Sequence, residues 1–98
     1  MGYYKRLAEE KMDTFTERLM EEKHKYDNAC YDTMYEFENN QITAEEMGEA
    51  SKQAFEFYHN FVSALVEEVF ELFEGDTETA IEWMEGYEWR PILDFLNI

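Results

Sequence analysis

Two short motifs in the chain place a carboxylate and an imidazole three residues apart. They join Glu21 to His24 and Glu56 to His59. Residues three apart share one face of a helix, so each motif can offer both groups to one metal ion. Carboxylates and imidazoles bind iron and other divalent metals. We expect His59 to lie on an apolar helical stripe, whereas Glu21 and His24 lie among polar residues, so only one of the two motifs is predicted to face inward.

The paired Glu-x-x-His motifs resemble the metal ligands of ferritin-like di-iron bundles, which also need one Glu from each of two further helices. Another pattern, Glu68-x-x-Glu71, resembles the first acidic motif of the all-helical MazG-type nucleotide pyrophosphohydrolases. That resemblance implies magnesium binding by Glu68 and Glu71, with Glu82 and Glu85 as a second pair. The chain departs from that family because Glu85 stands where the family has Asp, and no basic residue is near to hold a triphosphate. Metal binding stays an alternative; our main prediction has no catalytic residue, no metal and no cofactor.

The acidic residues of the chain outnumber the basic ones by 24 to 8 and are unevenly placed. Residues 1–25 hold six of each, whereas residues 26–98 hold eighteen acids and only two bases, Lys52 and Arg90, which accounts for the whole net charge of −16. Between these two bases, carboxylates recur every three or four residues. This acid row consists of Glu67, Glu68, Glu71, Glu74, Glu78, Glu82, Glu85 and Glu88.

The spacing of the acid row predicts carboxylates aligned along a helix. Like charges four residues apart cost a helix about 0.2–0.5 kcal/mol per pair, and no Lys or Arg interrupts them. Positions four apart are about 6 Å apart along the axis, which is close to the spacing of phosphates along a nucleic-acid strand. We therefore expect no direct binding to nucleic acid or anionic membranes, and a basic protein as the partner.

In size, helical pattern, acidity and aromatic content, the chain resembles the small phage-encoded DNA-mimic inhibitors of the anti-restriction and anti-CRISPR type. The resemblance rests on the acid row and on Trp83, Tyr87 and Trp89, which stand among the acids as candidate partner-binding anchors. It implies a stoichiometric inhibitor, not an enzyme, that occupies the basic groove of a nucleic-acid-binding host protein such as a CRISPR effector or restriction enzyme. The expected place is the cytoplasm, that of the host cell if the protein is phage-encoded. A solvated acidic face is the competing interpretation.

The apolar spacing predicts an all-α fold in one domain, residues 1–98: an antiparallel hairpin of two long helices, then two short C-terminal helices, as a helical bundle. We expect the first helix to run from about Tyr3 to Asn39. Its apolar stripe comprises Met12, Phe15, Leu19, Tyr26, Cys30, Met34 and Phe37. A straight helix of this length is about 55 Å long, so either the hairpin is elongated or the helix bends near residues 22–28.

Capping signals set the remaining boundaries. Thr43 and Glu46 form a capping box before the second helix, and Gly75 is the expected left-handed residue after it. Asp76 or Thr77 caps the third helix, and Pro91 lies in the first turn of the fourth.

The second helix carries two neighbouring apolar stripes, which is more apolar surface than one partner helix can cover. This helix is therefore either the centre of the core or part of a homodimer. The predicted dimer seam consists of Phe55, Val62, Val66 and Phe73, and an interaction module acting through this seam is a further alternative function. No apolar run approaches the roughly 20 residues of a membrane helix, and the single Cys30 excludes an internal disulfide.

Overall fold

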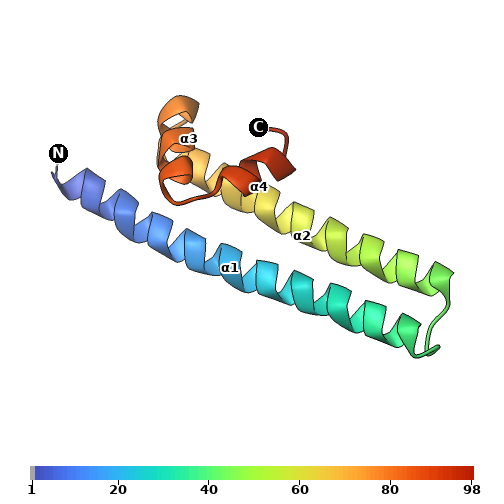
Figure 1. Cartoon of the computed structure of the whole chain (residues 1–98). Coiled ribbons are helices and arrows are strands. Elements are labelled where there is room, and N and C mark those ends of the chain that lie inside the picture. The colour runs from blue at the N-terminus through green and yellow to red at the C-terminus, as the bar shows by residue number, and fades with distance from the viewer. Residues whose placement is uncertain (1) are drawn as a thin grey trace.

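The computed structural model describes residues 2–98, with side chains from Lys5 onward. Its helices are α1 (Gly2–Glu38), α2 (Ala44–Leu72), α3 (Thr77–Gly86) and α4 (Arg90–Phe95). In Figure 1, α1 and α2 lie side by side and antiparallel, and α3 and α4 fold back over one end of the pair. The described residues contain no strand. The predicted all-α hairpin with two short C-terminal helices is confirmed.

The first helix is continuous, so the elongated form of the hairpin is the correct alternative. The 37 residues of α1 show no break between 22 and 28. The molecule extends 59 × 21 × 16 Å along its principal axes. It is therefore a rod made of two helices and thickened at one end by the other two.

Side-chain caps begin α2 and α3 as expected. The Thr43 hydroxyl accepts a hydrogen bond from the Glu46 amide at 3.1 Å, and the Thr43 amide donates to the Glu46 carboxylate at 3.2 Å. The Asp76 carboxylate accepts from both the amide and the hydroxyl of Thr79. These bonds favour the charged form and lower the pKa of Asp76. Pro91 stands in the first turn of α4, where a missing amide proton is tolerated.

All four helices end with a residue in the left-handed conformation, and none of these residues is glycine. They are Asn40, Glu74, Glu88 and Asn97, with φ between 54° and 65°. The prediction for Gly75 was wrong by one residue: Glu74 takes the left-handed C′ position, and Gly75 follows it with φ of 84°. The Gly75 amide donates to the Phe70 carbonyl and the Glu74 amide to the Glu71 carbonyl, which is the Schellman pattern.

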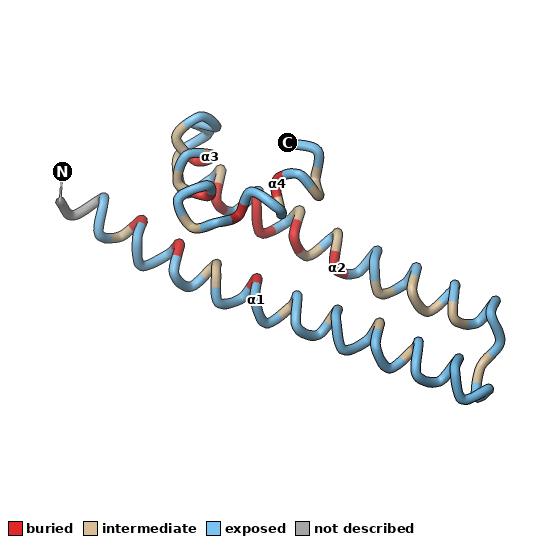
Figure 2. Tube along the Cα trace, viewed as in Figure 1, coloured by how far each residue is buried: buried red, intermediate tan, exposed pale blue. Residues whose placement is uncertain are grey.

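The core occupies only the thick end of the rod. Its buried members come from all four helices: Met12, Leu19, Tyr58, Val62, Leu65, Val66, Val69, Ala80, Met84, Trp89 and Leu93. Figure 2 shows that these positions lie where α3 and α4 cover the hairpin. The predicted apolar stripe of α1 is therefore buried only in its first half, since Met34 is 57% and Phe37 is 37% exposed.

The helices of residues 2–98 include none that is both long and apolar enough to cross a membrane.

Candidate functional site

The eight carboxylates of the acid row are all exposed, but they do not lie in one straight line. Glu67, Glu68 and Glu71 belong to α2, and Glu78, Glu82 and Glu85 belong to α3. Glu74 and Glu88 are the left-handed residues at the ends of these helices. The row therefore forms two segments, one on α2 and one on α3, because the turn at residues 73–76 redirects the chain between them.

Within each helix, the acids lie opposite the core. In α2 the buried residues include Val62, Val66 and Val69, and at about 100° per residue Glu67 and Glu71 fall on the other side. The same outer face of α2 carries further acids towards its N-terminus, namely Glu45, Glu49 and Glu56, all exposed. The acidic surface thus extends along most of the length of α2, beyond the row recognised in the sequence.

Two members of the acid row are engaged in ion pairs within the chain. The Arg18 guanidinium lies 3.1 Å from the Glu68 carboxylate and also lies over the rings of Phe15 and Phe61, at 6.0 and 5.9 Å from their centroids. Arg90 lies 3.3 Å from Glu85. Among the described residues, the other six acids of the row have no basic side chain within 4.0 Å, so their charges face solvent.

Arg90 also pairs with Asp94 within α4, at 2.8 Å, so its pair with Glu85 joins the end of α3 to α4.

Of the three predicted aromatic anchors, Trp89 is instead a core residue. It is 1% exposed, and its indole Nε1 donates to the Thr16 hydroxyl at 2.9 Å, which ties the α3–α4 corner to α1. Trp83 and Tyr87 are half-buried and stack on each other at 6.5 Å. These two rings keep surface that a partner can contact, whereas Trp89 does not.

The Tyr87 hydroxyl donates to the Glu9 carbonyl at 3.3 Å and is surrounded by acids of α1. Burial raises the pKa of Tyr87, and the negative charges of Asp13 and Glu9 raise it further. The hydroxyl is therefore held in its neutral form, as a donor between two helices.

Most of the predicted dimer seam is covered by other parts of the same chain. Val62 is 0% and Val66 is 2% exposed, because α1, α3 and α4 of the same chain cover them. Phe73 packs against Trp83 at 5.5 Å, and Phe55 packs against Phe95 at 5.4 Å, although Phe55 stays 44% exposed. The second stripe of α2 is thus explained by packing within one chain.

The residues of the metal motifs are spread over the molecule. Within the described residues, no three His, Cys, Asp or Glu side chains come together as a metal would require. Glu21, His24 and Glu56 are exposed, while His59 is half-buried against the ring of Phe95 at 5.6 Å. Of the carboxylates expected to bind magnesium, Glu68 and Glu85 pair with arginines instead.

One surface was missed by the sequence reasoning. The half of the hairpin that α3 and α4 leave uncovered exposes Tyr31, Met34 and Tyr35 of α1, and Met20 is exposed where this half meets the thick end. The available signal was that Met20, Tyr31 and Tyr35 lie beside Met34 on a helical face next to, but not part of, the predicted stripe of Met12 and Leu19.

No protein family, curated protein or solved structure matches this chain. Its function is therefore inferred from its own surface.

Proposed function

We propose that the protein is a stoichiometric inhibitor that places its acidic surface in the basic nucleic-acid groove of a host protein, such as a CRISPR effector or a restriction enzyme. It acts without turnover, by excluding the nucleic acid from that groove. The observation that carries the proposal is the shape of the molecule together with its charge.

The charge density of the rod is close to that of a nucleic-acid strand. A net charge of −16 distributed over 59 Å corresponds to about one negative charge per 3.7 Å of the long axis, compared with one phosphate of a given strand per about 3.4 Å of the DNA helix axis. A groove lined with Lys and Arg can therefore exchange strand phosphates for carboxylates at similar spacing. A carboxylate that faces solvent is available to pair with a Lys or Arg of the partner. Six of the eight acids of the row face solvent in this way.

The left-handed conformation of Glu74 and Glu88 supports the same proposal. Positions of this kind favour Gly or Asn, because a side chain with Cβ costs about 1–2 kcal/mol there. A glutamate at two such positions, with φ of 54° and 65°, is unfavourable for folding. Partner binding through their carboxylates gives a reason for their presence.

The test replaces Glu71, Glu78 and Glu82 together by Gln. First, the protein is immobilised and used to capture nucleic-acid-binding proteins from a cell lysate, with elution by duplex DNA. Affinity of the captured protein is then measured for the wild type and the triple variant. Three exposed ion pairs at about 0.2–1 kcal/mol each predict a loss of about 3- to 150-fold. The matched control, Glu10→Gln with Glu17→Gln and Glu21→Gln, removes the same charge from the balanced region of α1.

Two results contradict the proposal. In one, the triple variant and its control bind alike, which indicates that only overall charge matters. In the other, DNA and this protein bind the captured partner at the same time.

A further inference from the structure

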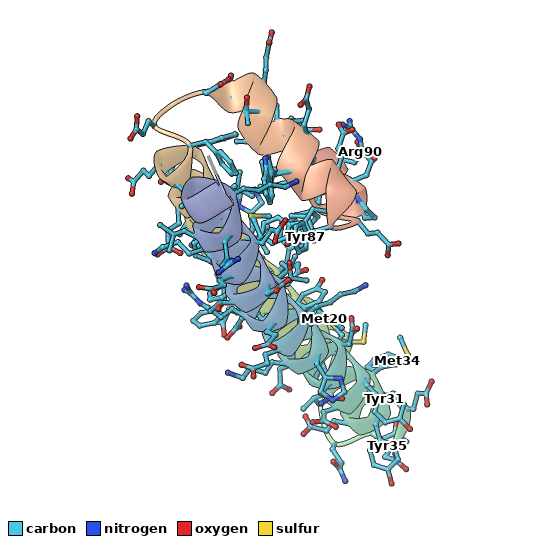
Figure 3. The ribbon with its side chains drawn as sticks, turned by 90° about the vertical axis from the view of Figure 1, so that its left-hand side faces the viewer. Met20, Tyr31, Met34, Tyr35, Tyr87 and Arg90 are labelled. Carbon is cyan, nitrogen blue, oxygen red and sulfur yellow. The ribbon has the colours of Figure 1, made fainter. Side chains whose placement is uncertain are left out.

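The uncovered half of the hairpin presents an apolar strip on α1. Met20, Tyr31, Met34 and Tyr35 are 66%, 70%, 57% and 55% exposed. Tyr31, Met34 and Tyr35 follow Met20 by eleven, fourteen and fifteen residues, which at about 100° per residue keeps the four side chains within about 100° of one another on the helix. Figure 3 shows them along one side of the rod, the side on which Tyr87 and Arg90 also lie. We call these four residues the α1 stripe.

The size of the α1 stripe suits the packing of one helix. Its two ends, Met20 and Tyr35, are fifteen residues apart in sequence, which is about 22 Å at 1.5 Å per residue. An aromatic side chain can bury about 150–250 Å², so the two tyrosines alone leave roughly 100 Å² or more each uncovered. At the thick end, the stripe reaches a cavity of about 290 Å³ between α1 and the α3–α4 corner, lined by Leu19, Met20, Tyr87, Trp89 and Ile92 among others.

The net charge of this half of the hairpin, on α1 and α2 together, selects the kind of partner. Residues 20–57 contain ten acids and three bases. Within the described chain, Glu22 is the only one of these acids in an ion pair, with Lys25 at 3.3 Å. Asp27 shares the helical face of the stripe, between Met20 and Tyr31. If a second copy bound here, two surfaces of net charge −7 would repel each other. A basic helix would instead neutralise this charge.

We propose that the α1 stripe binds a basic amphipathic helix of a partner protein. Apolar residues of that helix, repeating every three or four positions over about four turns, cover Met20, Tyr31, Met34 and Tyr35, and one enters the cavity beside Tyr87. Its Lys and Arg residues flank the apolar face and pair with carboxylates such as Asp27. This contact does not depend on nucleic-acid mimicry.

The test uses a labelled synthetic peptide of 18 residues, with Leu on one helical face and Lys elsewhere, and a scrambled peptide of the same composition. Fluorescence anisotropy measures binding at physiological ionic strength and at about 1 M salt, where the Debye length is about 3 Å. We expect the scrambled peptide to lose its binding in high salt and the amphipathic peptide to keep most of it. Tyr31→Ser with Met34→Ser should then weaken the amphipathic peptide at least about tenfold.

Phe57→Ser is the matched control. Phe57 is 69% exposed but lines a separate cavity with Lys25 and Ala29, so the variant should bind the peptide like the wild type. The Gln variant at Glu71, Glu78 and Glu82 should also keep its high-salt binding, which separates this proposal from the proposed function. Circular dichroism checks that each variant is folded.

Three outcomes overturn the inference. The first is equal binding of both peptides at high salt, and the second is unchanged binding by the Tyr31→Ser, Met34→Ser variant. The third is self-association of the protein alone at micromolar concentration that this variant abolishes, since the occupant is then a second copy.

Discussion

Replacement of Glu88 by glycine should stabilise the protein, although glycine normally weakens a helical protein. Glu88 has φ of 65° at the end of α3, where its amide donates to the Glu85 carbonyl at 3.0 Å. A Cβ in this conformation costs about 1–2 kcal/mol, and the extra chain entropy of glycine opposes its removal by about 0.5–1 kcal/mol. Glu88→Gly should therefore exceed Glu88→Ala in free energy of unfolding by about 0.5–1 kcal/mol, with the charge change identical in both.

Glu82 provides the opposite case on the same helix. It is exposed, and it lies in the interior of α3, where glycine is less favourable than alanine by about 0.8–1 kcal/mol. The Gly–Ala difference should thus change sign between positions 82 and 88. Urea unfolding followed by circular dichroism at 222 nm measures all four variants. If Glu88→Ala is as stable as Glu88→Gly, residue 88 is not left-handed, and the described corner between α3 and α4 is incorrect.

Two further predictions concern the thick end of the rod. Thr16→Val removes the acceptor of the Trp89 indole and should lower the free energy of unfolding by about 1–3 kcal/mol, the cost of a buried unpaired donor. Thr14→Val, which removes only an exposed hydroxyl bonded to the Glu10 carbonyl, is its control; equal urea midpoints for the two variants would show that the Trp89 bond is unimportant. Burial raises the pKa of Tyr58 and of Tyr26 above 10.0, as it does that of Tyr87. The folded state therefore holds the phenol protons of these tyrosines more tightly than the unfolded state does. The stability that the protonated tyrosines contribute is complete below pH 10.0 and is lost as the pH rises through their pKa values in the folded state. Tyr58→Phe should shift the alkaline unfolding transition to higher pH in a titration followed by circular dichroism, and an unchanged transition would contradict this account.

Local signals in the sequence were sufficient to predict the helices. The capping box at Thr43 and the cap at Asp76 depend on residues three apart, and both are present in the structure. The one boundary error concerns Gly75, because glycine is so strongly preferred at C′ that a glutamate one residue earlier was not considered. A helix end can accept either residue when its Schellman hydrogen bonds are formed, at the cost of strain in the non-glycine case.

The candidate surfaces depended on packing over long sequence distances, and there the sequence was less informative. Trp89 is fixed by Thr16, which is 73 positions away, so no local pattern distinguishes it from a half-buried ring such as Trp83. In the same way, an apolar stripe on α2 is compatible with a second copy or with α3 and α4 of the same chain. Only the fold shows that Val62 and Val66 are covered within one chain.

The division of the rod into a covered half and an uncovered half connects the two proposals. Two helices alone bury little apolar surface. The helices α3 and α4 supply a third layer that covers one end of the hairpin and leaves the other end uncovered. The covered end fixes the acids of α2 and α3 on rigid helices, which suits recognition by charge. The uncovered end leaves Tyr31, Met34 and Tyr35 in water, which suits recognition by apolar contact. A partner with both a basic groove and a basic amphipathic helix can bind the two ends of the rod at once. The two contacts can still be tested separately, because salt weakens charge pairing far more than it weakens apolar burial.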